Sequence, residues 1–334
     1  MKKLLVLVIS LIMLLGTVSI SNALTDTTCK TKYPIVMVHG AFMRDINMMG
    51  INYWWGIPDA LKAKGASFYV TNQDPFNSEA VRAQAVANEL GVQYALAGGP
   101  LYHFDKINII AHSMGPLDSR NVIANYAIPG VCAAGTCNTK VATLTSIAGT
   151  HTGSQVADVL WTLQTGIPIL GPIVGTVIED MINVIGGWFF LIQGQNTLAL
   201  LNDLTTSTVT KVFNPNTPNQ PGVLYQAYGG KVNPVSLISD PTSWVSELLY
   251  VVMKAGGAGD NDGLVSLDSA HIPSLCAAGK TCIAPVWRGA MTTSALYPGV
   301  NHFAEIDHFL GIHSGWDAKG FYVNLAKDLK AKGY

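Results

Sequence analysis

Charged residues are scarce in this chain. Lysine, arginine, aspartate and glutamate make up 12% of its 334 residues, and the formal net charge is −1. Proteins that bind nucleic acid carry a strongly basic face, so this balance argues against nucleic acid as a partner. Histidine is also infrequent, with eight residues. The chain also has five cysteines. No histidines cluster beside them at metal-ligand spacing, so a metal site built on these cysteines is disfavoured.

Apolar side chains, in contrast, are abundant at 49% of all residues. Two interpretations fit that figure. The protein works at a lipid or other water-insoluble surface, or it buries a large core. Composition alone does not separate them.

The first 23 residues are typical of a secretory signal peptide. Two lysines at positions 2 and 3 precede an apolar segment from residue 4 to residue 20, and a small-x-small pattern at 21–23 suits cleavage after Ala23. An uncleaved anchor is the alternative, because the apolar segment is slightly long for a signal peptide. We expect the protein to be secreted. We also expect one domain over residues 24–334, since no linker divides them.

Five cysteines in an exported protein suggest disulfides. The spacing offers two local pairs, Cys132 with Cys137 and Cys276 with Cys282, which leave Cys29 unpaired. Four cysteines allow three connectivities, so a long-range link between the two loops stays open.

Strand-like and helix-like segments alternate along the first half of the chain. Nearly continuous apolar runs are typical of strands buried on both faces of a parallel sheet. The predicted strands are 33–40, 68–71, 107–110 and 141–147, and the predicted helices are 57–64, 78–96 and 117–126. The alternation predicts an α/β fold with a mostly parallel, doubly wound sheet. Function in such sheets gathers at the carboxyl ends of the strands, where His39, Ser113 and Thr150 fall.

The third of these strands leads into Ala111-His112-Ser113-Met114-Gly115. A sharp strand-to-helix turn with this pattern lifts a serine hydroxyl above the sheet, and its flanking residues must be small. A chance match in a glycine-rich chain is the alternative. The pattern favours Ser113 as a nucleophile.

The segment 156–195 is unusually apolar. It holds two acidic residues and no basic residue after Asp158. Prolines at 168 and 172 break it, so short helices are expected rather than a membrane span. It forms either a mobile lid whose apolar face docks on lipid or a buried pair of inserted helices. We predict a lid or cap insertion.

A serine hydroxyl becomes nucleophilic when an imidazole takes its proton and a carboxylate fixes the imidazole tautomer. Downstream of Ser113, loops marked by glycine carry Asp262 and His302, in the order Ser, Asp, His that α/β-hydrolases use. Other acids and bases compete for these roles, namely Asp260, Asp268, His271, His308 and His313. The oxyanion of the intermediate needs two backbone N–H donors, which we assign to Ala41 and Met114.

The motifs around these residues resemble the secreted true lipases of Gram-negative bacteria, the Pseudomonas and Burkholderia type triacylglycerol lipases. The matching motifs span nearly all of the mature chain, at 33–36, 38–40, 53–61, 108–113, 149–154, 261–265 and 301–302. The resemblance implies an α/β-hydrolase with a triad of Ser113, Asp262 and His302. It implies Ala41 and Met114 as oxyanion donors, the segment 156–195 as the lid, and catalysis without a cofactor.

Three departures from that family limit the comparison. Ala111 stands where the family commonly has glycine. The family's structural calcium is held by an Asp-Pro aspartate, matched by Asp240, and by an acid two residues after the histidine, where this chain has Ala304. One anionic side chain would hold Ca²⁺ weakly, so we do not predict a calcium site. Two short cysteine loops also replace the family's single long link.

These observations together predict a secreted, monomeric serine carboxylester hydrolase, most simply a triacylglycerol lipase at an oil–water or membrane interface. The resemblance adds a periplasmic foldase as an expected partner. The same triad would serve an acyltransferase, a phospholipase or a short-chain esterase, because pocket shape and water exclusion decide the acceptor. A non-catalytic lipid-binding protein would lack a triad residue, and all three are present.

Overall fold

The computed structural model describes residues 26–41, 52–166, 196–233, 244–294, 297, 299–308 and 315–334. The predicted signal peptide, residues 1–23, lies outside the described residues, and so does the predicted lid from residue 167 onward to 195. Among the described residues, no helix has the length and hydropathy that a membrane crossing requires.

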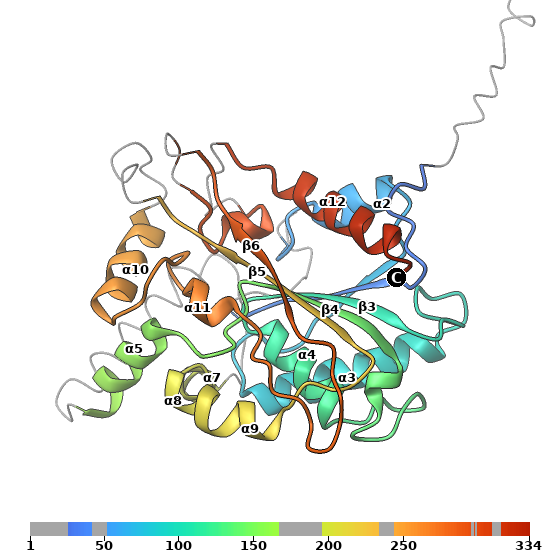
Figure 1. Cartoon of the computed structure of the whole chain (residues 1–334), viewed down its shortest axis with the longest axis horizontal. Coiled ribbons are helices and arrows are strands. Elements are labelled where there is room, and N and C mark those ends of the chain that lie inside the picture. The colour runs from blue at the N-terminus through green and yellow to red at the C-terminus, as the bar shows by residue number, and fades with distance from the viewer. Residues whose placement is uncertain are drawn as a thin grey trace, which may run out of the picture.

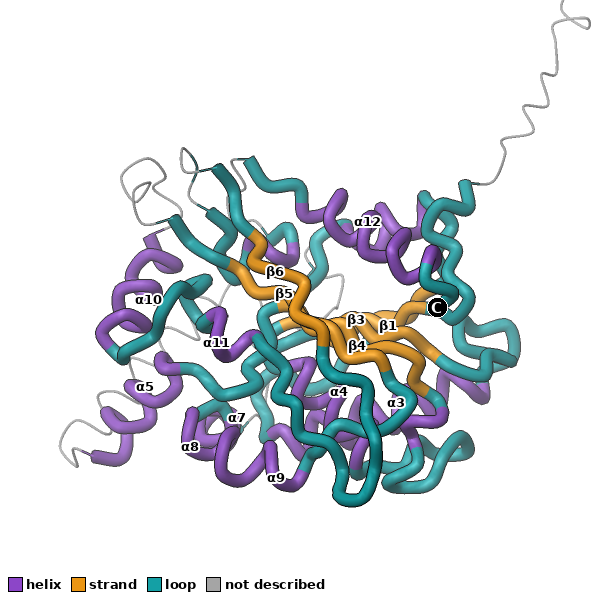
Figure 2. The backbone as a smooth tube through the Cα atoms, viewed as in Figure 1, coloured by secondary structure: helices purple, strands orange, loops and turns teal. Residues whose placement is uncertain are grey.

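Six strands form one sheet, and every neighbouring pair runs parallel. The order across the sheet is β2-β1-β3-β4-β5-β6. The strands are β1 (Ile35–Val38), β2 (Phe68–Val70), β3 (Ile107–His112), β4 (Val141–Ile147), β5 (Leu224–Gly230) and β6 (Val286–Met291). Figure 2 shows this sheet crossing the middle of the molecule with helices on both sides. The predicted α/β fold with a parallel, doubly wound sheet is confirmed.

The helices form two layers around the sheet. Helices α2 and α12 contact each other on one face, and α3 and α4 contact each other on the other (Figure 1). The longer helices are α2 (Ile57–Ala63), α3 (Glu79–Ala95), α4 (Gly115–Ala124), α5 (Gln155–Gly166), α7 (Thr197–Asp203), α10 (Trp244–Ala255) and α12 (Ala318–Ala331). The short ones are α8 (Thr206–Thr208), α9 (Asn214–Asn216) and α11 (Leu267–Ala270).

Side-chain caps explain where two of these helices begin. The Ser78 hydroxyl accepts a hydrogen bond from the Val81 backbone N–H at the start of α3. The Asp317 carboxylate does the same for the Gly320 N–H at the start of α12. Each cap satisfies a backbone donor that the first helical turn leaves unpaired.

The core lies on both faces of the sheet, and β1 shows how the sequence divides it. Val36 and Val38 are buried with the residues of α3, such as Leu90. Ile35 and Met37 are buried with residues of the other layer. Successive side chains of a strand point to opposite faces, so a continuous apolar run fills both layers at once.

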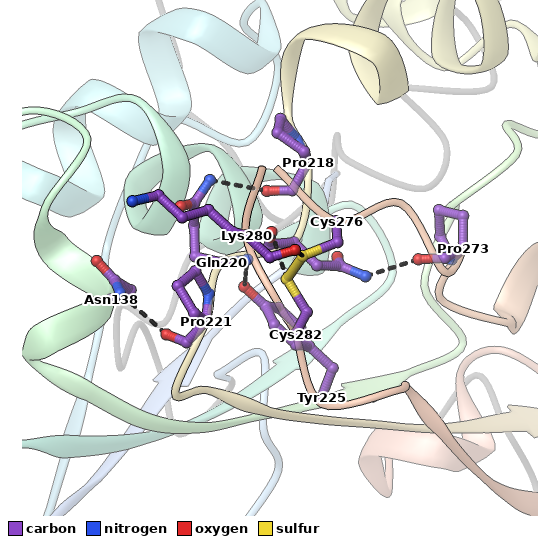
Figure 3. The surroundings of a disulfide bond; sticks show 10 residues. Asn138, Pro218, Gln220, Pro221, Tyr225, Pro273, Cys276, Lys280 and Cys282 are labelled. Atoms are coloured by element: carbon purple, nitrogen blue, oxygen red, sulfur yellow. Dashed lines mark hydrogen bonds between the residues drawn. A yellow bond between two sulfur atoms is a disulfide. The ribbon is translucent and has the colours of Figure 1, made fainter. Parts of the chain in front are cut away.

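The cysteines form the two predicted local disulfides, Cys132 with Cys137 and Cys276 with Cys282, and Cys29 is free and buried. The second disulfide closes a loop that lies against the segment containing Asn219 (Figure 3). The Asn219 side-chain amide donates to the Pro273 carbonyl at 2.7 Å, and the Ala277 N–H donates to the Asn219 carbonyl at 3.1 Å. The disulfide therefore stabilises a loop that is hydrogen-bonded to the segment preceding β5.

The two ends of the described chain meet at the edge of the sheet where the strands begin. The Lys32 backbone N–H, three residues before β1, donates to the Tyr334 carbonyl at 2.7 Å. The Lys330 ammonium of α12 donates to the Thr27 carbonyl at 2.6 Å. Residues 26–32 are thus bound to the last helix.

Candidate active site

Ser113 occupies the turn between β3 and α4. Its φ angle is 63°, in the left-handed region that non-glycine residues seldom adopt. The turn is tight, because an ideal Cβ built at Gly115 would lie 2.5 Å from the Val38 carbonyl oxygen. The glycine is required by that approach, and Ala111 is accommodated fully buried on the other side of the serine. The expected strand-to-helix turn is present.

His302 and Asp262 reach Ser113 from two separate loops. His302 follows β6, and Asp262 lies between α10 and α11. The Ser113 Oγ is 2.8 Å from His302 Nε2, and His302 Nδ1 is 2.8 Å from Asp262 Oδ2. The other oxygen of Asp262 accepts the backbone N–H groups of Leu264 and Val265 at 2.8 and 2.7 Å. The three side chains are buried, so bulk water does not compete for these contacts.

This arrangement can activate a hydroxyl. A carboxylate only accepts hydrogen bonds, so Asp262 keeps the imidazole proton on Nδ1. The lone pair of His302 Nε2 then faces the Ser113 hydroxyl and can take its proton. The protonated imidazole that results is stabilised by the carboxylate behind it.

Two of the residues that competed for these roles have well-defined contacts elsewhere. Asp260 forms an exposed ion pair with Lys231 at 2.6 Å. The His271 ring stacks on Trp287 with the ring centroids 3.8 Å apart. The remaining competitors are Asp268 in α11, His308 beside Phe303 and Trp55, and His313, which lies outside the described residues.

The backbone at Gly40 and Ala41 passes directly beside the serine. An ideal Cβ at Gly40 would lie 2.5 Å from Ser113 Cβ and 3.0 Å from Ser113 Oγ. Met114 lies next to the serine at the N-cap of α4. The two residues expected to supply oxyanion donors, Ala41 and Met114, therefore flank Ser113 from β1 and from α4.

Arg82 of α3 binds the backbone at His39 and Gly40. No feature of the sequence indicated this residue. Its Nη2 group donates to the His39 and Gly40 carbonyls, each at 3.1 Å. In a trans peptide the C=O and N–H point in opposite directions. A guanidinium bound to the Gly40 carbonyl therefore directs the Ala41 N–H away from Arg82.

The Arg82 guanidinium is buried and paired with Asp118 of α4, with Nη2 and Oδ2 2.8 Å apart. Burial raises the pKa of Asp118 to about 6, against the opposing effect of Arg82. The pair joins α4 to the backbone at Gly40, just after the end of β1. No local motif signals it, because the two residues are 36 positions apart.

A second buried network adjoins His302 and was also missed from the sequence. His112 Nε2 lies 2.8 Å from Glu305 Oε2, and His302 Nδ1 lies 3.8 Å from the same oxygen. Burial, followed by the neighbouring Asp262, raises the pKa of Glu305 well above its usual value. Burial and His302 lower the pKa of His112, so this imidazole is neutral. One feature of the sequence could have indicated this network: Glu305 lies three residues after His302, close enough for both side chains to meet on one turn.

His112, His302 and Glu305 are also the described group of side chains whose ligand atoms come close enough to surround one cation, all within 4.8 Å. His302 Nδ1 is already engaged by Asp262, and Glu305 by His112. Protein hydrogen bonds therefore already use both ring nitrogens of His112 and of His302, and the geometry favours proton transfer.

The position two residues after His302 does not fit a calcium ligand. Ala304 is 1% exposed and lies in an apolar cluster with Tyr322 and Leu325. Ca²⁺ takes oxygen ligands, and a methyl group in apolar surroundings supplies none. The matching aspartate, Asp240, lies outside the described residues.

Comparison with curated proteins finds relatives over most of the chain. The chain is 31% identical over 324 residues to a triacylglycerol lipase of Vibrio cholerae, covering 91% of this chain and 89% of the relative. It is 28% identical to a triacylglycerol lipase of Burkholderia plantarii, covering 86% of this chain and 82% of the relative. No protein-family model matches the chain.

Solved structures agree on the fold. The Staphylococcus hyicus lipase superposes with a TM-score of 0.60 over 90% of this chain and 96% of its own, at 18% identity. Lipase 1 of Pelosinus fermentans gives a TM-score of 0.58 over 90% of this chain and 99% of its own, also at 18% identity. The expected α/β-hydrolase fold is confirmed.

Proposed function

The chain belongs to the triacylglycerol lipase family, and from this premise we propose that Ser113, His302 and Asp262 are its catalytic triad. Members of this family are carboxylic ester hydrolases of the serine hydrolase type. The observation that carries the proposal is the unbroken chain of hydrogen bonds from Ser113 Oγ through His302 to Asp262, each 2.8 Å long.

The reaction follows from the positions of these groups. His302 Nε2 takes the hydroxyl proton while Ser113 Oγ forms a bond to the acyl carbon of the ester. The carbonyl oxygen becomes an oxyanion, which accepts hydrogen bonds from the Ala41 and Met114 N–H groups. When the tetrahedral intermediate collapses, the C–O bond to the alcohol breaks and the leaving oxygen receives the proton from His302. Asp262 stabilises the imidazolium throughout.

Water completes the cycle. His302 removes a proton from a water molecule as its oxygen attacks the acyl-enzyme, and the proton is returned to Ser113 Oγ as the fatty acid leaves. All proton transfers use side chains of this chain. No cofactor enters the proposed mechanism.

The proposed substrate is a triacylglycerol at an oil–water interface. The described start of the predicted lid is α5, which contacts α10 and α7 through apolar side chains such as Val156, Leu249 and Leu201. Neighbouring α10 and α7 also carry exposed apolar residues, Val251 at 56% and Leu198 at 48% exposure. This apolar helical end, set apart from the sheet in Figure 1, supports a role in contacting lipid.

Three further parts of the proposal concern the protein in its cell. We propose that residues 1–23 direct export, that the mature enzyme acts outside the cell as a monomer, and that a periplasmic foldase assists its folding. The apolar segment at residues 4–20 supports the first of these. Sequencing the amino terminus of the secreted enzyme tests it, since cleavage after Ala23 gives Leu24 as the first residue.

The proposed function is tested by initial rates on emulsified long-chain triacylglycerols and on soluble p-nitrophenyl butyrate. We compare the wild type with Ser113→Ala and with Ser119→Ala, a buried serine of α4 whose hydroxyl donates to the Gly115 carbonyl. Ser113→Ala should lower kcat about a thousandfold or more on both substrates, whereas Ser119→Ala should stay near wild type.

The outcomes separate the alternatives. A preference for emulsions that disappears in Ser113→Ala supports a lipase. Activity restricted to the soluble ester points to a short-chain esterase. Acyl transfer to an added alcohol in preference to water points to an acyltransferase. Near-normal activity of Ser113→Ala refutes the triad.

A further inference from the structure

Tyr53 lies at the junction of the two networks around the candidate active site. It precedes α2, is 2% exposed, and its hydroxyl is 2.6 Å from His112 Nδ1. The same hydroxyl is hydrogen-bonded to the Gly40 backbone. An ideal Cβ at Gly40 would lie 2.6 Å from this oxygen, so the phenol contacts the backbone directly. The Tyr53 hydroxyl thus contacts both the Gly40 backbone, which lies beside Ser113, and the His112 ring, which lies beside His302.

The direction of each hydrogen bond follows from the donors available. The Gly40 N–H can only donate, so the Tyr53 oxygen accepts from it. The single proton of the phenol is then directed at His112 Nδ1. A neutral imidazole that accepts at Nδ1 carries its proton on Nε2, which donates to Glu305 Oε2 at 2.8 Å. Tyr53 therefore selects the tautomer of His112.

His112 in turn forms a surface against which His302 lies. The two rings are 4.5 Å apart between centroids and inclined by 37°. His112 is held at one ring nitrogen by Tyr53 and at the other by Glu305. An imidazole fixed at both nitrogens cannot rotate, so it limits the orientations open to His302.

We propose that Tyr53 is a positioning residue for ester hydrolysis, which it assists by fixing both the His39–Gly40 peptide, directly before the Ala41 N–H, and the His112 ring. This inference rests on the proposed function, because it assumes that Ala41 and His302 act in the reaction. Tyr53 does not touch the reacting atoms. Its contribution is to hold two groups of the reaction at once from a single buried oxygen.

Loss of the hydroxyl leaves two buried polar groups without a partner. In Tyr53→Phe the Gly40 N–H loses its acceptor and His112 Nδ1 loses its donor. Both regain hydrogen bonds only by moving, since an unsatisfied buried polar group is costly. We expect kcat to fall about tenfold with KM within about twofold, because the groups that move act on the transition state.

The chain offers a matched control in Tyr322 of α12. Tyr322 is fully buried in the same apolar cluster as Tyr53. Its hydroxyl has no hydrogen-bond partner among the described residues. Tyr322→Phe therefore removes the same atom from the same core without disturbing the network, and all kinetic constants should stay within about twofold of wild type.

The experiment measures kcat and KM of both variants on soluble p-nitrophenyl butyrate, together with inhibition by an alkyl boronic acid. The boronic acid forms a tetrahedral adduct with serine whose oxygen occupies the oxyanion position. Its inhibition constant should rise by the same factor by which Tyr53→Phe lowers kcat/KM. A general loss of stability would not produce this match. Equal behaviour of the two variants, or a change in KM alone, overturns the proposal.

A second measurement does not depend on any variant folding. Nitrogen-15 NMR of the histidine rings in the wild type should show His112 with its proton on Nε2. A proton on Nδ1 overturns the proposal. If Ser113→Ala retains activity, the proposed function itself fails. If Ser113→Ala is inactive and Tyr53→Phe matches Tyr322→Phe, only the role of Tyr53 fails.

Discussion

Gly40 has no side chain, and this allows the end of β1 to lie very close to Ser113. A methyl group there would overlap Ser113 Cβ and the Tyr53 hydroxyl, both within 2.6 Å. Gly40→Ala should therefore displace the Ala41 N–H and lower kcat on p-nitrophenyl butyrate by about 100-fold or more, the effect of losing one oxyanion donor.

The control for that change is Gly259→Ala. An ideal Cβ at Gly259 meets no atom within 4 Å. We expect its kcat and Tm to equal those of the wild type. If Gly40→Ala retained more than half of the wild-type kcat, the close approach of the two loops would not matter for catalysis.

Glu305 gives a prediction for the pH dependence of stability. Its pKa in the folded state is raised by burial and by Asp262. A carboxyl group with a raised pKa contributes stability that is fully present below its unfolded value, 4.5, and is lost as pH rises through the folded value. Glu305→Gln removes this titration while keeping an oxygen to accept from His112. The Tm of the variant relative to wild type should rise between pH 5 and pH 9.

Thermal unfolding of both proteins at pH 5, 7 and 9 measures this difference. Glu89→Gln is a suitable control, because Glu89 of α3 is partly exposed and accepts a hydrogen bond from the Tyr69 hydroxyl. A Tm difference between wild type and Glu305→Gln that stays constant with pH would show that Glu305 is ionised throughout the range.

At this scale the sequence predicted a sharp turn at Ser113 with Asp262 and His302 as its partners. The structure brings the three within hydrogen-bond distance, and their catalytic roles stay a prediction. Their signals are local, because each lies in a short motif marked by glycine. Tyr53 and Arg82 act through contacts with residues far along the chain. A single sequence carries no record of such contacts, and so these residues could not be predicted.

Among the structural elements, the loop closed by Cys276 and Cys282 has a measurable role. It binds the segment that precedes β5, because the Ala277 N–H donates to the Asn219 carbonyl. Figure 3 shows the surroundings of this disulfide. Replacing both cysteines with serine restores the entropy of the unfolded loop, which for a ring of this size corresponds to about 2 kcal/mol of stability. The Tm should fall by roughly 3 °C, while kcat stays near wild type because the disulfide lies at the entry to β5 and Ser113 follows the end of β3.

Differential scanning calorimetry of the double variant and of the wild type, each with and without reductant, tests this. Reductant should lower the Tm of the wild type and have a smaller effect on the variant, which retains only the Cys132–Cys137 bond. An unchanged Tm in the double variant would show that the Asn219 contacts hold the loop without the disulfide.

The strands show which secondary-structure elements can be predicted from the sequence and which cannot. The four predicted strands correspond to β1–β4, in which apolar and β-branched residues predominate. Strands β5 and β6 were not predicted. In β5 the buried Gln226 interrupts the apolar run and is satisfied by Thr145 and Arg288, and in β6 an arginine and a glycine lie at a partly exposed sheet edge. A strand with buried polar residues lacks a clear apolar pattern, because the partners of those residues lie on neighbouring strands that the sequence does not reveal.

For the molecule as a whole, we expect independence from calcium. Ala304 offers no ligand at the position where the family resemblance implies an acid, and it is buried among apolar side chains. Activity on p-nitrophenyl butyrate and the Tm should both be unchanged after treatment with EDTA. A soluble ester is used because calcium also removes fatty acids from emulsions. A fall in Tm that added Ca²⁺ reverses would contradict this expectation.

The meeting of Lys32 with Tyr334 has a practical consequence for attaching the enzyme to a support. Both residues lie at the edge of the sheet where the strands start, whereas Ser113 follows the end of a strand. A tether fused at Tyr334 would orient the reactive edge away from the support, with α5 and α10 free to meet an oil droplet. The same proximity makes a circular permutant feasible, with a short peptide joining these two points and new ends opened at an exposed loop such as the one around Gly98.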